Sequence, residues 1–357
     1  MKSILLKIKG GTVLNNLLIR KKWTGIIITI FTVIFIAACQ QGEESPSTDN
    51  PAEESQDDTN NNDTNNNTAH TEEISFTDNM DREVVLDGQP ERIVVLASEF
   101  LKLMYDLDGE AVGRMTTTSV PIPEEAEDLP ELGTVSQINT EELLALSPDL
   151  VIGSPNFHAE LEGILENSDI PLALLTMRSF DDVKERAALM GEILGKEELA
   201  AEKLQETETE MQEVQDQLPS DLEPSVVVLN VTSGSVSVQR TNTTALEIGD
   251  LLHVNNIGKD MEASPDSQTS APYSLETIAE QQPDYILITI HGSVEAGEER
   301  IAEDLEGNPA WGSLKAVQEG NVHTIPSGMY LSNPGLDYAD TMKHMGEIVY
   351  PEVFGNE

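Results

Sequence analysis

The sequence is poor in cysteine, in basic residues and in aromatic side chains. Its 357 residues include one Cys, 20 Lys and Arg against 65 Asp and Glu, and only 4% aromatic residues. A single thiol cannot form a disulfide within the chain, so stability must come from the burial of apolar surface, for which the chain is long enough. Nucleic acid is excluded as a partner, because phosphate binding requires clustered cations and the formal net charge is −45.

Several motifs of catalysis and metal binding are absent as well. The sequence has no HExxH, Cys-x-x-Cys, G-x-S-x-G or G-x-x-x-x-G-K-[ST] segment, and it contains only six His. These absences argue against zincins, structural zinc sites, serine hydrolases and P-loop enzymes. Carboxylates are so numerous that pairs of them carry no information on glycosidase-type catalysis. We therefore assign no catalytic residue and no catalytic cofactor.

The region before the one cysteine has the layout of a secretory signal. Six basic residues and no acid precede Cys39, and an apolar stretch from Gly25 ends in Ile36-Ala37-Ala38-Cys39. A charged segment, a short apolar stretch and small residues before a cut are typical of export signals. The run resembles the lipobox of bacterial lipoproteins, in which the Cys accepts a diacylglycerol and becomes the new N-terminus. The rival interpretation is an uncleaved membrane anchor, for which about fifteen apolar residues are short.

Residues 1–38 are therefore expected to be a signal peptide, and Cys39 to tether the protein to membrane lipid on the extracytoplasmic face. Without the signal, 14 basic residues remain against 65 acidic ones, a net charge of about −51. Such acidity suits a salty or alkaline medium, or it forms an acidic ligand-binding surface. The acids are spread evenly along the chain, which favours the environmental explanation. Residues 39–73 are almost purely polar and are expected to be a disordered tether after the lipidated Cys.

From residue 74 onward, short apolar runs alternate with helical patterns. Strands are predicted at 93–96, 111–115, 149–153, 171–175, 225–231, 285–290 and 322–325. Helices are predicted at 99–107, 140–146, 158–167, 181–194, 246–254 and 275–280. Apolar runs of this kind fit parallel strands that are buried on both faces. The alternation predicts an α/β fold with mostly parallel sheets and right-handed crossovers.

An internal repeat indicates two similar lobes. Residues 139–154 (NTEELLALSPDLVIGS) match 274–289 (SLETIAEQQPDYILIT), each with a helix, a Pro-Asp turn and a buried strand. Between the halves, 196–218 has one apolar stripe and no proline, which predicts a single helix near 30 Å long. A coiled-coil partner helix is disfavoured because the stripe is short. The predicted organisation is an N-terminal lobe at 74–182, a helical connection at 183–223 and a C-terminal lobe at 224–357.

Polar residues follow equivalent strands of the two halves. In open parallel sheets, ligands bind beyond the carboxyl ends of the strands. His291-Gly292 follows the strand at 285–290, and Asn156-Phe157-His158 comes at the equivalent point of the first half. These segments are expected to face each other across a cleft. His291 is a candidate metal ligand, with Gly292 allowing close approach, and the alternative is a capping or solvated histidine.

Five segments together carry a family resemblance. They are ERIVVL at 91–96, SPDLVI at 147–152, EIGDLL at 247–252, QPDYIL at 282–287 and NPAWGSLKAVQEGNV at 308–322. On these, the chain resembles the iron-complex and cobalamin substrate-binding proteins of ABC importers over about residues 74–352. The resemblance implies a periplasmic-binding-protein-like fold, two α/β lobes joined by one long α-helix. It also implies a monomer that is no enzyme and that delivers a cleft ligand to a permease dimer.

The same resemblance implies an acidic docking residue on each lobe. By position, we place these at Glu99 and Asp250, with Glu247 as the neighbouring alternative. Within the family, YILITIHG at 285–292 and SGMYLSNP at 327–334 look most like the haem receptor lipoproteins of Gram-positive bacteria. In those proteins, the histidine that corresponds to His291 and a first-lobe methionine ligate the iron. Here Ser136 stands in place of the methionine.

Haem is the favoured cargo, with a hydroxamate-type ferric siderophore or cobalamin as alternatives for the same fold. Met115, Met177 or His158 could replace the missing haem ligand, or the iron could be five-coordinate. The residues expected to contact the ligand are His291, Gly292, Ser136, Asn156, Phe157, Arg178, Arg240 and Met329. Ferric catecholates would need several cleft cations, of which Arg114, Arg178 and Arg240 are the best placed. From other classes, a chelatase-like enzyme is disfavoured by the export signal, and a tethered adhesin or sensor would lack a deep cleft.

Overall fold

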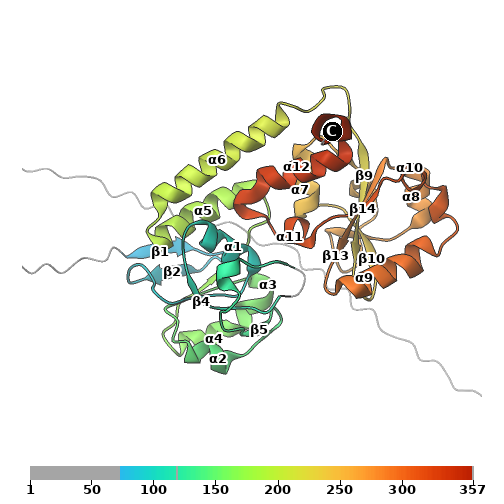
Figure 1. Ribbon diagram of the computed structural model, residues 1–357. Helices are drawn as coiled ribbons and strands as arrows, with labels where there is room; N and C mark the ends of the chain where they lie inside the picture. Colours follow the sequence, from blue (N-terminus) through green and yellow to red (C-terminus); the bar gives the residue numbers. More distant parts are fainter. Residues whose placement is uncertain (1–72, 118–119, 356–357) are drawn as a thin grey trace, which may run out of the picture. The chain divides into compact units, whose positions relative to one another are not determined.

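The computed structural model describes residues 73–117 and 120–355 (Figure 1). The predicted signal peptide, Cys39 and the tether up to residue 72 lie outside the described residues. Within the described ranges, no helix is both long enough and apolar enough to span a bilayer.

The first half is a lobe around a parallel sheet. Its elements are β1 (Ile74–Thr77), β2 (Glu83–Leu86), β3 (Ile93–Val95), α1 (Ser98–Asp106), β4 (Ala111–Arg114), β5 (Gly133–Thr134), β6 (Gln137–Ile138), α2 (Thr140–Ala145), β7 (Leu150–Gly153), α3 (Pro155–His158), α4 (Glu162–Glu166) and β8 (Leu172–Leu174). Four strands form the sheet in the order β4-β3-β7-β8, and every pair in it is parallel. Helices lie on both faces, so successive residues of β3 enter different cores, Ile93 and Val95 one, Val94 the other.

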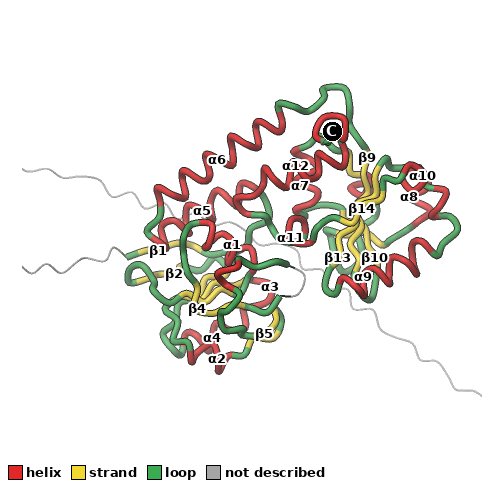
Figure 2. The backbone as a smooth tube through the Cα atoms, viewed as in Figure 1, coloured by secondary structure: helices red, strands yellow, loops and turns green. Residues whose placement is uncertain are grey.

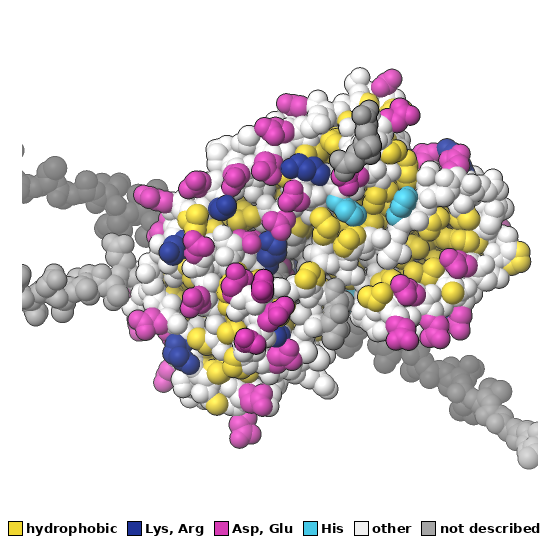
Figure 3. Space-filling model, viewed as in Figure 1, with side chains coloured by type: hydrophobic (Ala, Val, Ile, Leu, Met, Phe, Trp, Pro, Cys, Tyr) yellow, Lys and Arg dark blue, Asp and Glu magenta, His cyan; other side chains and the backbone are white. Residues whose placement is uncertain are grey.

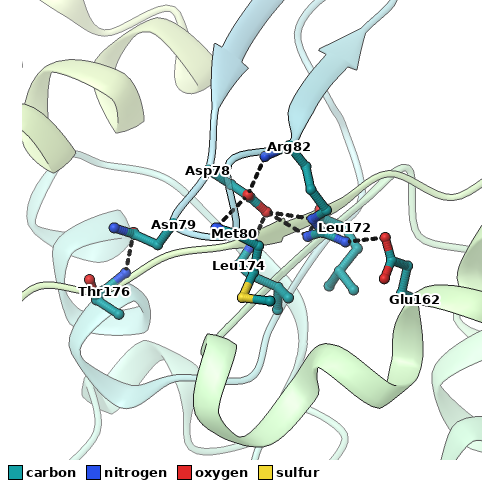
Figure 4. A network of polar contacts seen from close by, with 8 residues as sticks. All are labelled: Asp78, Asn79, Met80, Arg82, Glu162, Leu172, Leu174 and Thr176. Carbon is teal, nitrogen blue, oxygen red and sulfur yellow. Dashed lines mark hydrogen bonds and ion pairs between the residues drawn. The ribbon is translucent and has the colours of Figure 1, made fainter. Parts of the chain in front are cut away.

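The β1–β2 hairpin is attached to this lobe by one buried carboxylate (Figure 4). Asp78, 5% exposed, accepts hydrogen bonds from the backbone N–H groups of Met80, Arg82 and Leu174. The Arg82 guanidinium binds Asp78, the Leu172 carbonyl and Glu162. Burial alone would raise the pKa of Asp78, but these hydrogen bonds hold it below its ordinary value. Sequence patterns had not predicted this hairpin.

Two consecutive helices connect the halves, as Figures 1 and 2 show. Helix α5 (Phe180–Leu194) begins at a capping box of Ser179 and Asp182 and ends at Gly195, whose φ of 62° suits glycine. Helix α6 (Glu197–Gln215) follows at once. It confirms the long connecting helix, 19 residues or about 28 Å.

The second half contains a mixed sheet. Its elements are β9 (Ser225–Val231), β10 (Val236–Gln239), α7 (Thr244–Leu251), β11 (Asn255–Asn256), β12 (Ser270–Pro272), α8 (Leu275–Gln281), β13 (Tyr285–Ile290), α9 (Val294–Arg300), a π-helix (Ile301–Glu306), α10 (Lys315–Glu319), β14 (Val322–Thr324), α11 (Ser327–Tyr330), α12 (Tyr338–Val349) and α13 (Pro351–Phe354). The main order is β12-β10-β9-β13-β14, with β11 also paired to β9. Strands β9, β11, β13 and β14 pair in parallel, but β10 is antiparallel to both of its neighbours. The fold is α/β with mostly parallel pairing, as predicted, while β10 and β12 were missed.

The internal repeat is confirmed in its structural roles. Asn139 and Ser274 cap α2 and α8 with their side chains, and Ser147 and Gln282 have left-handed backbones with φ near 48° and 46°. Asp149 then accepts hydrogen bonds from the backbone N–H groups of residues 91 and 92, just before β3. In the same way, Asp284 accepts from the backbone and hydroxyl of Ser225 at the start of β9. Each Pro-Asp turn therefore fixes the start of the strand next to its own.

A continuous core joins the two lobes. It contains residues of β3 and α1 in the first lobe, of α5 and α6, and of β9, α7 and α12 in the second. Helix α12, which was not predicted, packs on α6 and α7. Separate cores fill the far faces of the two sheets. A shared core favours a nearly fixed arrangement of the lobes.

One predicted helix is wrong as a single element. The expected helix at 158–167 is divided into α3, a 3-10 turn (Ala159–Leu161) and α4. His158 has non-helical backbone angles, φ −118° and ψ 3°, and its side chain turns back to accept a hydrogen bond from Ser154. This local bond replaces the continuous helix.

Candidate functional site

A cavity of about 300 Å³ lies between residues of both lobes. The first lobe contributes Glu99 from α1 and Met177 and Arg178 from the segment after β8. The second lobe contributes Asn230, Ser237, Gln239, Asn242, Thr243, Thr244, Thr269, Ser270, His291, Tyr330, Leu331, Ser332 and Asn333. Asn230 stands near the carboxyl end of β9, and His291 directly follows β13. The cavity thus occupies the place where open parallel sheets bind ligands.

A hydrogen-bond network holds the second-lobe wall. Gln239 donates to the Thr289 hydroxyl at 3.1 Å and accepts from the Thr243 hydroxyl at 2.6 Å. The Thr289 hydroxyl lies 3.1 Å from the Leu229 carbonyl and 3.3 Å from Asn230 Oδ1. Gln239 and Thr289 are buried, so these bonds satisfy polar groups that water cannot reach. The wall therefore presents fixed amide and hydroxyl groups.

His291 directly follows β13 and lines this cavity, which is where the strand-end argument predicted it. Its backbone N–H donates to the Val231 carbonyl at 2.8 Å, which extends the β9–β13 pairing by one residue. Its side chain is exposed. Gly292 has φ 97°, which favours glycine, and a Cβ there would meet nothing within 4 Å. A ligand can therefore approach the imidazole without steric obstruction from this residue.

Tyr330 forms a buried part of the floor. Its hydroxyl lies 2.8 Å from His344 Nδ1 and 3.2 Å from the Thr341 carbonyl. Burial raises the pKa of Tyr330 far above its ordinary value and lowers that of His344. A neutral tyrosine hydroxyl at this position supports the packing of α11 on α12 rather than offering charge to a ligand.

Glu99 lies in the cavity wall, which differs from its predicted place on an outer docking surface. The side chain is half-buried in the first turn of α1. Burial raises its pKa, against smaller opposing effects of its own backbone N–H and of the Ser98 hydroxyl. Asp250 is exposed on α7 and lines a neighbouring cavity of about 670 Å³ together with Arg178, Arg240 and Lys259.

Glu247, the alternative docking residue, is engaged inside the molecule. Its carboxylate accepts from the Phe180 backbone N–H at 2.8 Å and from the Tyr338 hydroxyl at 2.7 Å. Asn333 donates to the same Tyr338 oxygen at 3.1 Å. Burial raises the pKa of Glu247, while the bonds from Tyr338 and Phe180 oppose that effect. Glu247 thus links α7 to the beginning of α5 and to α12, and is not a free surface acid.

Two of the three candidate cleft arginines are occupied elsewhere. Arg114 is 5% exposed, and its guanidinium donates to the Ala126, Met115 and Glu127 carbonyls and pairs with Glu131. Arg240 donates to the carbonyls of residues 259, 261 and 268, which organises the loop before β12. Neither lines the 300 Å³ cavity. Arg178 does, and in the described part of the chain its guanidinium forms no ion pair.

Other predicted contacts also fall outside this cavity. Ser136 is exposed in the turn between β5 and β6, and Asn156 and Phe157 are exposed on α3. Met329 packs against the shared core. None of the four is among the lining residues. Gly292 adjoins the cavity through His291.

Among the suggested substitutes for the haem methionine, only Met177 lines the cavity with His291. His158 is fully buried and its Nδ1 accepts from the Ser154 backbone at 2.9 Å. Its Nε2 has no hydrogen-bond partner of ordinary geometry among the described residues. Burial lowers the pKa of His158, and the nearby Val135 backbone opposes this shift in part. Steric enclosure therefore removes His158 as a ligand.

Sequence reasoning missed the amide and hydroxyl groups of the second-lobe wall. The segment VTSGSVSVQRTNTT at 231–244 is rich in Ser, Thr and Asn between two apolar runs. This composition was the available signal, because polar residues next to a strand end are candidates for ligand contact.

Comparison with known proteins finds relatives that are named for iron complexes. The Fe(3+)-citrate-binding protein YfmC of Bacillus subtilis is 23% identical over 264 residues, 72% of this chain and 80% of that protein. The ferric-anguibactin-binding protein FatB of Vibrio anguillarum is 28% identical over 249 residues, 67% of this chain and 76% of that protein.

Solved structures share the fold. Staphylococcus aureus SirA complexed with staphyloferrin B has a TM-score of 0.64 at 19% identity, covering 78% of this chain and 98% of SirA. Staphylococcus aureus IsdE complexed with heme has a TM-score of 0.62 at 19% identity, covering 72% of this chain and 98% of IsdE. The family model described as "Periplasmic binding protein" matches residues 93–328, well over half of the sequence. The chain therefore belongs to the periplasmic binding protein family.

Proposed function

We propose that this chain is the extracytoplasmic solute-binding protein of an ABC importer, and that it carries an iron complex to a permease dimer. The observation that carries this proposal is the cavity between the lobes, lined by strand-end residues of both. Relatives named for ferric citrate and ferric anguibactin support iron as the cargo. Binding and release require no chemistry from the protein, so the role is not enzymatic.

The cavity wall favours a ferric siderophore with polar donors over haem, which reverses the preference drawn from sequence resemblance. Eleven of the sixteen lining residues carry neutral side chains with an amide or hydroxyl group, and only Met177 and Leu331 are purely apolar. The oxygen-rich surface of a hydroxamate complex matches such groups. A porphyrin face needs broad apolar contact, which this wall supplies poorly.

Haem stays the second candidate because of one specific juxtaposition. His291 and Met177 come from different lobes and line the same cavity. His and Met are a ligand pair that haem iron accepts in proteins. A cargo of this kind would enter with its iron between the lobes.

A titration with several iron complexes tests the proposal. We expect a ferric trihydroxamate to bind with a Kd near or below about 1 μM, a binding free energy of about −8 kcal/mol. Haem should bind at least tenfold more weakly and give no sharp shift of the Soret band. A Soret shift that His291→Ala removes would instead assign haem. No saturable binding of ferric hydroxamate, ferric citrate, cobalamin or haem would refute the function.

The anchor forms part of the same proposal. A lipid on Cys39 would hold the protein at the outer face of the membrane, and residues 40–72 would give it reach to the permease. The description of some relatives as lipoproteins supports this placement.

For permease docking, the geometry favours another pair of acids over Glu99 and Asp250. A permease dimer offers two equivalent surfaces, so the docking acids should be related by the internal repeat of the lobes. Glu141 and Glu276 hold matched positions in the first turns of α2 and α8, and both are exposed. Glu99 faces the cavity instead.

Charge reversal distinguishes the two assignments. The double variant Glu141→Lys with Glu276→Lys should abolish uptake, while ligand affinity stays within about threefold, because rim charges act on association and orientation. The matched control Asp250→Lys should transport normally. Normal uptake by the double variant, or loss of uptake with Asp250→Lys alone, would contradict the repeat-related pair.

A further inference from the structure

The charges that line the ligand cavity differ from those on the rest of the molecule. Among the described residues of its wall, Glu99 is the one carboxylate, with Arg178 as the permanent cation and His291 as a titratable group. Elsewhere acids dominate, 65 against 20 basic residues in the chain. Figure 3 shows acidic side chains scattered over the visible outer face. Glu99 is therefore the single acid in a wall made mostly of neutral hydrogen-bonding side chains.

Among the described residues, no cation forms an ion pair with Glu99 within 4.0 Å. Its carboxylate accepts a hydrogen bond from Ser98 Oγ at 3.4 Å. Neither Arg178 nor His291 contributes to the shift in its pKa, which burial causes. A half-buried carboxylate without a cationic partner loses hydration that one long hydrogen bond from Ser98 replaces only in part.

The position of Glu99 is held by the contact between the lobes. The neighbouring Ser98 hydroxyl lies 3.3 Å from the Ser332 hydroxyl of the second lobe, and Ser332 lines the same cavity. One turn further along α1, Lys102 pairs with Asp106 and with Asp337 of the C-terminal segment. These bonds on both sides restrain the start of α1, so the carboxylate cannot move far from the cavity.

We propose that Glu99 is a specificity-determining residue that selects ferric complexes bearing a cationic or strongly donating group. The inference rests on the proposed function of iron-complex binding. A cationic group on the cargo would form a charge-assisted hydrogen bond to the carboxylate and replace its lost hydration. A complex with several negative charges would meet an unpaired carboxylate in an exported protein of net charge about −51, and the exposed Arg178 is the one arginine among the described wall residues to offset it. Specificity here comes from repulsion as well as attraction.

A matched pair of probes isolates the charge. Ferrioxamine B carries one free ammonium group outside its iron centre, and its N-acetylated form has the same iron centre without that charge. The full-length protein, purified from membranes in detergent, should bind the ammonium form at least about tenfold more tightly. Glu99→Gln should reduce this preference to within about twofold, with affinity for the acetylated form unchanged or higher. Glu110→Gln, on an exposed glutamate outside the cavity, should keep the wild-type preference.

Each failure has its own meaning. Equal binding of the two probes by the wild-type protein, or a preference that survives in Glu99→Gln, would overturn the role of Glu99. If neither hydroxamate binds but ferric citrate or haem does, the inference fails and the proposed function stands. If no iron complex binds, both fail. A loss of both probes in Glu99→Gln, with an unfolding temperature no lower than that of the wild-type protein, would make Glu99 a general contact and not a charge selector, which also contradicts the proposal.

Discussion

Replacement of Glu247 by Ala should weaken the junction between the lobes. The substitution removes two hydrogen bonds to a carboxylate, from the Phe180 backbone N–H and from the Tyr338 hydroxyl. Tyr338 is fully buried and its ring packs on Phe180 with centroids 5.1 Å apart, so water cannot easily replace the lost acceptor. Hydrogen bonds to charged groups contribute about 1.5–3 kcal/mol each. Because Glu247 is only half-buried, we expect a total loss of about 3 kcal/mol in the free energy of unfolding.

Thermal unfolding measures this loss directly. For domains of this size, about 3 kcal/mol corresponds to a fall in Tm of about 6 °C or more. Glu247→Gln is the matched control, because its amide oxygen can still accept from Phe180 but its NH2 group cannot accept from Tyr338. This control variant should lose about half as much free energy of unfolding as Glu247→Ala. A common core joins the lobes, so far-UV circular dichroism and the fluorescence of buried Trp311 should report the same transition.

The effect should also depend on pH. Burial raises the pKa of Glu247 in the folded protein, so the folded state binds the proton more tightly than the unfolded state. The stability that Glu247 contributes is therefore largest below its unfolded pKa of about 4.5 and falls as pH rises through the folded pKa. The loss caused by Glu247→Ala should be larger at pH 5 than at pH 8. A loss below about 1 kcal/mol, or one that grows with pH, would refute this account of the junction.

Three further substitutions give independent tests. Asp78→Asn should reduce the free energy of unfolding by at least about 2 kcal/mol at pH 7. Because the folded pKa of Asp78 is lowered, the stability advantage of the wild-type protein should shrink as pH falls below about 4. Denaturant unfolding that gives the same difference in free energy of unfolding at pH 7 and at pH 3 would contradict this. Glu99→Gln should raise Tm at pH 8 and leave it unchanged at pH 4, because ionisation of a carboxyl with a raised pKa destabilises the fold; a lower Tm at pH 8 would count against it. Cys39→Ala should leave an unlipidated precursor, and incorporation of labelled fatty acid into that variant would end the lipoprotein interpretation.

Much of the fold could be predicted because buried parallel strands leave a simple pattern. Runs such as 93–95 and 285–290 are apolar on both faces and lie between helical segments, so their place in a central sheet followed from burial alone. The Pro-Asp repeat was informative for a physical reason. A left-handed residue, a proline and a strand-capping aspartate are all needed to join each helix to its strand.

The missed elements have equally specific causes. Strand β10 has the sequence Val236–Gln239 among Ser, Thr and Gly, and its antiparallel pairing depends on a hairpin that propensity does not reveal. Helix α12 does carry a readable stripe of Tyr338, Met342, Met345 and Val349. The helix at 158–167 was overestimated because His158 bonds to the Ser154 backbone.

The site was only partly predictable because a side chain's partners are set by tertiary contacts. The strand-end rule placed His291 correctly in the cavity wall. The same rule could not distinguish Arg178 from Arg240, whose guanidinium is occupied by three carbonyls of a distant loop. Nor could it tell whether Glu99 faces outward or into the cavity, since either is compatible with a position just after the first strand of the sheet.

The central claim is that an iron complex binds between the lobes, in the cavity bounded by Glu99, Met177 and His291. Anomalous diffraction at the iron absorption edge, from crystals grown with ferrioxamine B, tests this most directly. We predict a single strong iron peak inside that cavity, with the ammonium group of the cargo within hydrogen-bonding distance of the Glu99 carboxylate. An iron peak in the neighbouring cavity beside Arg240 and Asp250, or the absence of a peak between the lobes, would contradict the account.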